Sequence, residues 1–306
     1  MQESTNQTTN KSSTISTEIM GGLGNQLFQI FNTIAYSLRH KVPFYFSDEP
    51  IKNGQRKKTY WDTPLLQTLK PFIKASTPSL TYNERQFNYQ AIPPPPPPPL
   101  KLFGYFQSYK YFQDQQEEIY KFIRLAETKS IIKEKTQQPP YNYNYANDNN
   151  NNSNLIAIHF RVGDYKNLPN HHPLMTLEYY TEALKQLLEE AAQDSNTHNI
   201  LYFCEEADQD YVQKQMILPL KANPLFTNKI GSYQCINHKL EDWEQVLVMS
   251  LCQKHIIANS TFSWWGAYLS EENKQEVYYP TTWFGPAMGH KNMSDFFPPH
   301  WHKINV

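Results

Sequence analysis

The chain has 306 residues, which is long enough for two domains that each bury a core of their own. Its 28 Lys and Arg residues nearly balance its 29 Asp and Glu residues, so net charge gives no sign of a nucleic-acid or membrane partner. No apolar run is long enough to cross a membrane, and residues 1–17 lack the apolar stretch of a signal peptide. We therefore expect a cytoplasmic protein without a membrane anchor.

The cysteines support the same expectation. Cys204, Cys235 and Cys252 each lie in or next to an apolar run, and their spacing is not that of metal ligands. This pattern favours reduced thiols within a core, which is typical of an intracellular setting.

Two segments interrupt an otherwise regular alternation of strands and helices. Residues 93–99 are all proline, which predicts a short polyproline II rod that is either a loop insertion or an SH3-type ligand. Residues 137–154 are rich in Asn and too polar to pack, which predicts a flexible linker. With a disordered N-terminus at 1–17, this linker separates two domains, 18–136 and 155–306. Both have the order strand, turn, helix, so we expect two Rossmann-like α/β domains that face each other across a cleft.

The first domain opens on a glycine-rich turn. A strand over 14–20 runs into Gly21–Gly24, and an amphipathic helix follows. The start of this turn is similar to a dinucleotide-binding motif, but Leu27 stands where the third glycine belongs. The turn either lets backbone N–H groups approach a ligand or is a plain tight turn.

The segment 159–165, HFRVGDY, is the most informative part of the second domain. An apolar run leads into it, as in a buried strand that ends at the edge of a sheet. Side chains alternate along a strand, so His159 and Arg161 point to one side and Phe160 to the other. Arginine at such a position favours an anion, and phosphate suits its planar fork. The alternative is an ion pair between Arg161 and Asp164 that fixes a tight turn.

A second predicted anion site follows a later strand. Apolar periodicity predicts four further elements: helices over 176–192 and 243–252 and strands over 200–204 and 255–258. After the last strand, Ser260, Thr261 and Ser263 supply hydroxyls at a helix start, where unpaired N–H groups converge. Plain N-capping needs only one of them, and it remains the alternative.

Residue types that bind metals occur, but not in convincing sets. Asp208 and Asp210 match a D-x-D pattern, yet they start an amphipathic segment, and two carboxylates alone make a thin metal site. His171 and His172 have no further His or Cys at ligand spacing. We expect no metal.

Several segments together resemble one enzyme family, the inverting α1,2-fucosyltransferases. They are GGLGNQLFQ at 21–29, FGYFQSYKYF at 103–112, HFRVGDY at 159–165, YFCEEAD at 202–208 and ANSTFSWWGAYL at 258–269. The resemblance implies a GT-B fold and a galactoside α1,2-fucosyltransferase. It also implies GDP-β-L-fucose as donor, a galactose-terminated glycan as acceptor, and no metal or other cofactor. A fucosyltransferase of another linkage, or a binding protein without activity, remain alternatives.

The resemblance also implies roles for particular residues. Arg161 would hold the donor diphosphate and stabilise the leaving GDP, with His159 beside the nucleotide. The base is not implied by the resemblance: Asp164, His171 and His172 are the titratable groups just beyond the strand end, and Asp164 is alternatively the partner that orients Arg161. The remaining donor contacts would come from the first domain (Gly22, Gly24, Asn25 and Gln26) and from the second (Asp242 at the guanine, and Ser260, Thr261, Phe262 and Ser263 at a phosphate).

One position departs from that family. Its members often carry a second arginine directly after the first, and here that residue is Val162. If strand alternation persists, Val162 faces away from Arg161, and the site has one arginine where others have two.

Overall fold

The computed structural model describes residues 13–51, 58–77, 79–97, 99–145, 155–190, 197–270 and 276–306. The chain forms two compact units. Unit 1 comprises Met1–Ile123 and Met293–Phe296, and unit 2 comprises Arg124–Asn292 and Phe297–Val306. Within the described ranges, no helix has both the length and the apolar character needed to cross a membrane.

Unit 1 is built on a five-stranded sheet in which every strand pairing is parallel. The strand order is β3-β2-β1-β5-β4. The strands are β1 (Ile15–Thr17), β2 (Phe44–Ser47), β3 (Ile73–Lys74), β4 (Leu80–Asn83) and β5 (Leu100–Phe103). The helices are α1 (Leu23–His40), α2 (Gln116–Phe122) and the short turns η1 (Gln67–Phe72), η2 (Tyr109–Tyr111) and η3 (Gln113–Gln115).

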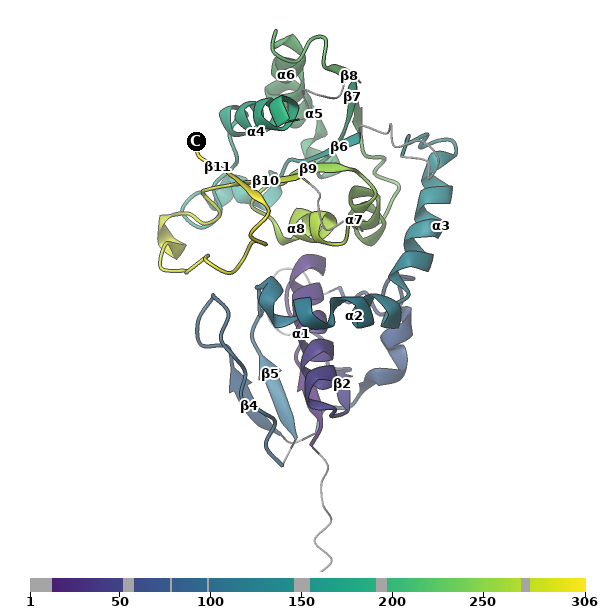
Figure 1. Cartoon of the computed structure of the whole chain (residues 1–306), viewed down its shortest axis with the longest axis vertical. Helices are drawn as coiled ribbons and strands as arrows, with labels where there is room; N and C mark the ends of the chain where they lie inside the picture. The colour runs from purple at the N-terminus through teal and green to yellow at the C-terminus, as the bar shows by residue number, and fades with distance from the viewer. Residues whose placement is uncertain are drawn as a thin grey trace, which may run out of the picture. The chain divides into compact units, whose positions relative to one another are not determined.

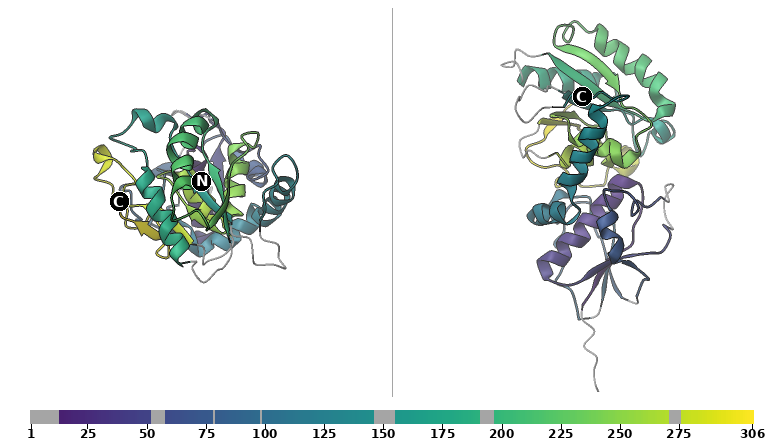
Figure 2. Two further views of the ribbon diagram at one scale, coloured as in Figure 1. Left: turned by 90° about the horizontal axis from the view of Figure 1, so that it is seen from above. Right: turned by 90° about the vertical axis from the view of Figure 1, so that its right-hand side faces the viewer.

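Helix α1 is the core of unit 1. It is buried on all sides from Gln26 to Ser37, and its buried polar side chains Gln26, Gln29 and Thr33 are hydrogen-bonded to backbone oxygens. It ends where Lys41 adopts a left-handed conformation and donates its N–H to Leu38 O at 3.3 Å. Figures 1 and 2 show α1 lying along the strands of unit 1.

Unit 2 contains a six-stranded parallel sheet with the order β11-β10-β9-β6-β7-β8. The strands are β6 (Leu155–His159), β7 (His198–Phe203), β8 (Ile230–Cys235), β9 (Lys254–Ile256), β10 (Glu276–Pro280) and β11 (His302–Ile304). The helices are α3 (Leu125–Gln137), α4 (Leu177–Glu190), α5 (Gln209–Val212), α6 (Leu218–Ala222), α7 (Asp242–Ser250) and α8 (Thr261–Tyr268). Short helical turns are η4 (Gly163–Asn167), η5 (Glu206–Asp208), η6 (Gln213–Ile217) and η7 (Pro286–Met288).

Helices cover both faces of the unit 2 sheet. Side chains of α4 and of the α5–α6 segment share one apolar core with alternate residues of β6 and β7. In Figure 1, α4 lies on one side of β9 and β10, and α7 and α8 lie on the other. Two α/β units with parallel sheets confirm the predicted fold class. The cleft between them stays a prediction.

The strand order places a topological switch point in each unit. In unit 2 the chain proceeds from β6 to β7 and β8 on one side, and then from β9 to β10 and β11 on the other. In unit 1 the corresponding neighbours are β1 and β5. Ligands of open parallel sheets bind outside the carboxyl ends of the strands at such points.

The boundary between the units differs from the sequence prediction. It falls at Ile123 and Arg124, so α3 belongs to unit 2, and the late stretch Met293–Phe296 belongs to unit 1. The Phe296 ring lies 6.0 Å from that of Phe28, and an apolar anchor of this kind has no periodic signal in the sequence. Part of the N-terminus predicted to be disordered is also ordered, because β1 begins at Ile15. Residues 1–12 lie outside the described residues.

The predicted flexible linker is wrong for its first half. Tyr143 and Tyr145 are buried in unit 2. The Tyr143 hydroxyl accepts a hydrogen bond from Asn237 N at 2.8 Å, and the Tyr145 hydroxyl lies 2.9 Å from that of Thr136. Residues 138–145 are therefore fixed by tyrosines that the polar composition of the segment obscured. Residues 146–154 lie outside the described residues.

The proline run joins β4 to β5 and lies along unit 1. Pro93 O accepts a hydrogen bond from the Tyr36 hydroxyl at 2.5 Å, and Pro96 O accepts one from Ser13 Oγ at 2.7 Å. These contacts support the loop-insertion interpretation, and Pro98 lies outside the described residues.

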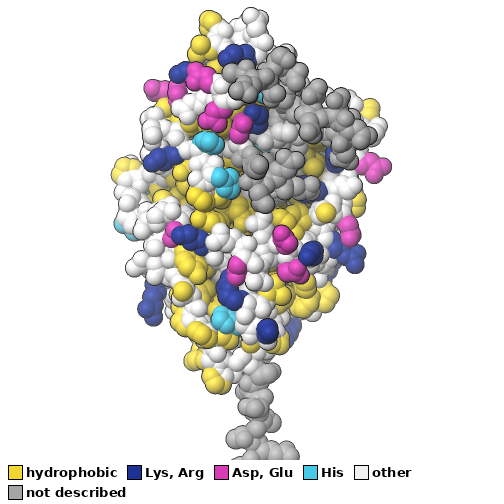
Figure 3. All heavy atoms as spheres, viewed as in Figure 1, with side chains coloured by type: hydrophobic (Ala, Val, Ile, Leu, Met, Phe, Trp, Pro, Cys, Tyr) yellow, Lys and Arg dark blue, Asp and Glu magenta, His cyan; other side chains and the backbone are white. Residues whose placement is uncertain are grey.

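On the face drawn in Figure 3, acidic and basic side chains are interspersed, as the near-neutral net charge predicts.

Replacing Tyr145 with Ala tests whether the tyrosine segment stabilises unit 2. Loss of a buried aromatic ring lowers the free energy of unfolding by roughly 3 kcal/mol. Tyr141→Ala is the matched control, since that side chain is partly exposed, and its cost is below about 1 kcal/mol. Equilibrium unfolding in urea measures both, and equal effects of the two substitutions would contradict this account.

Candidate functional site

The candidate site lies at the switch point of unit 2. The carboxyl end of β6 leads into His159–Tyr165, and the carboxyl end of β9 leads into Asn259 and the start of α8. The two segments meet, because the rings of His159 and Phe262 are 5.3 Å apart and the Tyr165 hydroxyl donates to Asn259 O at 3.1 Å. The structure thus brings both predicted anion sites together.

Arg161 stands at the centre of this region. Its side chain is 12 % exposed. One terminal nitrogen donates to Glu205 Oε1 and the other to Asp164 Oδ1. The Tyr165 ring lies under the guanidinium, with its centroid 4.8 Å away. The ion pair with Asp164, which was the alternative interpretation of the segment, is therefore present.

The two carboxylates stabilise the charged form of Arg161. Burial acts to lower its pKa, but the negative charges of Glu205 and Asp164 outweigh burial and raise the pKa. The side chain therefore stays cationic at any physiological pH. A guanidinium also has more N–H donors than these two ion pairs use, so the pairs orient Arg161 without saturating it.

A glycine makes room for the ion pairs. Gly163 has a φ of +31°, and a Cβ there would lie 3.0 Å from Glu205 Oε2. The turn is held by Asp208, which accepts from Gly163 N at 2.7 Å and from Lys166 Nζ at 2.7 Å. Sequence reasoning assigned no role to Glu205 and treated Asp208 only as part of a D-x-D pattern. Glu205 and Asp208 directly follow β7, and their closeness to Arg161 could be inferred only from the pairing of β7 with β6.

Strand alternation persists beyond the end of β6. Phe160 and Val162 are buried in the apolar core beneath the sheet, on the opposite side from Arg161. A second arginine at position 162 would place its charge in that core. The site therefore has one arginine because the next side chain belongs to the core of the unit.

His159 is a buried neutral base. Its side chain is 7 % exposed, and its Nδ1 has no hydrogen-bond partner within the described structure. Burial, with a smaller effect from the Arg161 charge, lowers its pKa to about 3. The Tyr180 hydroxyl donates to His159 O at 2.9 Å and fixes the backbone. A ligand atom beside His159 would meet an uncharged imidazole.

The three hydroxyl residues predicted at the start of α8 have different environments in the structure. Ser260 is the N-cap, and its hydroxyl accepts from Phe262 N at 3.3 Å. Ser263 is fully buried and its hydroxyl donates to the carbonyls of Ser260 and Ala258, so burial excludes it from ligand contact. Thr261 and Phe262 are partly exposed and remain candidates for ligand contact.

Two histidines follow the turn. His172 stacks on Tyr165, with ring centroids 4.7 Å apart, and its Nδ1 has no hydrogen-bond partner in the described structure. Burial lowers the pKa of His172, although the Asp164 charge acts the other way, so it is neutral at pH 7. His171 is exposed.

In unit 1, some of the ligand contacts predicted at the glycine turn are buried and others are partly exposed. Gly21 has a φ of +77°, and a Cβ there would lie 2.6 Å from Asn25 Nδ2. Gln26 is fully buried and its amide donates to Gly21 O and Lys58 O, each at 2.8 Å, so it braces the turn from inside. Gly24 is likewise buried within α1, whereas Gly22 and Asn25 are partly exposed.

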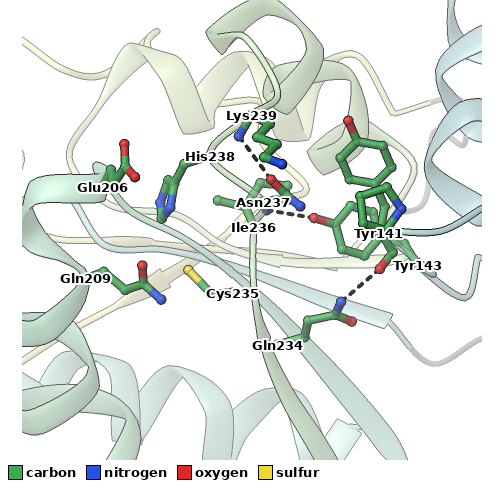
Figure 4. Close-up of a pocket in the computed structure, with 11 residues that line it drawn as sticks. Tyr141, Tyr143, Glu206, Gln209, Gln234, Cys235, Ile236, Asn237, His238 and Lys239 are labelled. Carbon is green, nitrogen blue, oxygen red and sulfur yellow. Dashed lines mark hydrogen bonds between the residues drawn. The ribbon is translucent and has the colours of Figure 1, made fainter.

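A pocket lies at the carboxyl ends of β7 and β8. It has a volume of about 460 Å³ (Figure 4) and is lined by Pro140, Tyr141, Tyr143, Glu206, Gln209, Gln234, Cys235, Ile236, Asn237, His238 and Lys239. Glu206 is the neighbour of Glu205, the partner of Arg161. Asp242, the predicted guanine contact, is partly exposed at the first position of α7 and is not among the lining residues.

Open parallel sheets that bind ligands, nucleotides among them, at the switch point define a class of α/β proteins. Comparison with protein families agrees with that class: the description Glycosyl transferase family 11 matches residues 67–305, and the chain belongs to this family. The resemblance to the α1,2-fucosyltransferase family is thereby confirmed.

Named relatives cover most of the chain at low identity. An alpha-1,2-colitosyltransferase of Escherichia coli is 22% identical over 94% of this chain and 97% of its own length. A galactoside 2-alpha-L-fucosyltransferase of Caenorhabditis elegans is 25% identical over 93% of this chain and 77% of its own length. Among solved structures, a mutant of Arabidopsis thaliana FUT1 in complex with GDP has a TM-score of 0.48 at 11% identity. The match covers 94% of this chain and 75% of that one.

The buried His159 predicts a specific acid sensitivity. Its pKa in the fold, about 3, lies below the ordinary value of 6.5, so the unfolded chain binds more protons between these values. Stability is therefore lost as the pH falls from about 6.5 towards 3. His159→Gln makes that loss shallower by up to about 1.4 kcal/mol per pH unit. Urea unfolding at a series of pH values measures the slope, and identical slopes in the two proteins would show that His159 is not buried as a neutral base.

Proposed function

We propose that the chain transfers L-fucose from GDP-β-L-fucose to the 2-hydroxyl of a galactoside, with inversion and without a metal. The observation that carries the proposal is the arginine at the switch point, beside a buried neutral histidine and a helix start. Family membership supports glycosyl transfer. The names of both long-covering relatives specify linkage to position 2, which supports the proposed regiochemistry.

Neutralising the leaving diphosphate is the main demand on a metal-free site. Inversion requires the acceptor hydroxyl to attack the anomeric carbon opposite the departing GDP, through an oxocarbenium-like state. Charge then develops on the diphosphate, and donors that are already in place stabilise it best. Arg161 is such a donor because Glu205 and Asp164 hold its guanidinium. The partly exposed start of α8, at Thr261 and Phe262, adds the positive end of the helix dipole.

The remaining residues receive narrower roles. The unpartnered Nδ1 of His159 suits a hydrogen bond to the nucleotide. Asp242 lies at the same edge of the sheet, and we assign it to the guanine. Asp164 orients Arg161. His172, neutral at pH 7 with an unpartnered nitrogen, is the candidate for the base that takes the acceptor proton.

A second donor is supported by one relative. The colitosyltransferase matches nearly its full length, so colitose in place of fucose is the alternative sugar at the same site. Parallel reactions with the two nucleotide-activated sugars separate these candidates by rate.

The assay that tests the function combines the protein, GDP-fucose, a β-galactoside and EDTA. We expect GDP release that depends on the acceptor, and NMR of the product should show fucose on the 2-hydroxyl. GDP binding without turnover would instead make the chain a binding protein on this scaffold. A product with another linkage would overturn the regiochemistry alone.

Arg161→Ala should lower the rate of transfer at least about tenfold. A charge-assisted hydrogen bond contributes roughly 1.5–3 kcal/mol, and about 1.36 kcal/mol corresponds to one decade of rate. Arg85→Ala, which removes an exposed arginine of unit 1, is the matched control and should leave the rate unchanged. Near wild-type transfer by Arg161→Ala would remove the basis for the mechanism.

A further inference from the structure

Three side chains of the kind that soft metals prefer lie together, and two of them, Cys235 and His238, line the pocket in Figure 4. Cys204 follows β7, Cys235 ends β8, and His238 lies in the loop after β8. Their ligand atoms all lie within 4.8 Å of one another. No sequence motif marks this group, because its members come from two strands and a loop that only the sheet brings together.

The spacing of these atoms suits an ion between them. Tetrahedral zinc has bonds of roughly 2.0–2.3 Å, which place two ligand atoms about 3.5–3.8 Å apart. The observed group is within about 1 Å of that arrangement. Cys235 and His238 are partly exposed and line the pocket, while Cys204 is buried behind them. An ion can therefore enter from the pocket.

The strand register favours a bridging ion over a disulfide. Cys235 is the register partner of Tyr202, so Cys204 lies two positions further along the neighbouring strand. That diagonal corresponds to a Cα separation of about 8 Å. Disulfides need roughly 4.4–6.8 Å, so a direct bond would require the backbone to move.

A hydrogen bond also sets the form of His238 that can bind a metal. His238 Nε2 lies 3.1 Å from the carbonyl oxygen of Cys204, and donation there leaves Nδ1 with the lone pair that a metal needs. Metals bind the thiolate form of cysteine.

We propose that Cys204, Cys235 and His238 bind one thiophilic divalent ion, Zn²⁺ by preference, with the fourth coordination position facing the pocket. Water or the carboxylate of Glu206, which lines the same pocket, completes the set. The ion is separate from glycosyl transfer, because none of its ligands is among the residues assigned to the donor. The proposal therefore stands or falls independently of the transfer reaction.

Cobalt provides the direct test, because thiolate-bound Co²⁺ absorbs in the near ultraviolet. The full chain is reduced, stripped with chelator and titrated with Co²⁺ without oxygen. We expect one ion per chain, a thiolate-to-cobalt band, and loss of that band on adding Zn²⁺. Cys235→Ser and His238→Ala should each weaken binding at least about tenfold.

Cys252→Ser is the matched control. Cys252 is a buried cysteine of the same unit that lies outside the group, so its substitution should leave cobalt binding unchanged. Both ligand substitutions change partly exposed side chains, so we expect the variants to fold, and circular dichroism checks this. Absence of the band, an equal loss in Cys252→Ser, or a disulfide between Cys204 and Cys235 in protein that binds no metal would each overturn the proposal.

Discussion

Arg161 keeps its positive charge in a largely buried position because two carboxylates hold it there. A cation at this depth is costly unless it is paired, and the pairs with Glu205 and Asp164 meet that requirement. The pairs depend in turn on Gly163, whose missing side chain leaves room for Glu205, and on Asp208, which fixes the turn. The ion pairs, the glycine and the fixed turn at the end of β6 together hold the Arg161 guanidinium in one orientation.

The parallel sheet explains where that guanidinium lies. All strands of unit 2 run in one direction, so the segments after β6, β7 and β9 end at one edge, and the order of the strands makes β6 and β9 neighbours. Alternation along the chain then places Val162 in the apolar core and Arg161 on the opposite side. The valine where related proteins often have a second arginine is therefore a core residue of this chain.

Patterns of short range were predictable from the sequence, and contacts of long range were not. Periodicity and glycine position predicted α1, α4, α7 and α8 and the strands around them. The ion pair between Arg161 and Asp164 was the alternative interpretation of its segment, and it is present. Glu205 could not be assigned, since its role requires knowing that β7 lies beside β6. Ser263 and Gln26 were chosen for their chemistry, but burial directs their polar atoms to the backbone. The burial of Tyr145 could not be predicted because the residues around it are polar. The group of Cys204, Cys235 and His238 could not be predicted because its members are far apart along the chain.

The central claim is that Arg161 contacts the phosphates of a nucleotide, and calorimetric titration tests it most directly. GDP and guanosine are each titrated into the unmodified protein and into Arg161→Ala. The account predicts that the substitution weakens GDP binding at least about tenfold, the value of one charge-assisted hydrogen bond, and leaves guanosine binding unchanged. Equal effects on both ligands, or no effect on GDP, would contradict it.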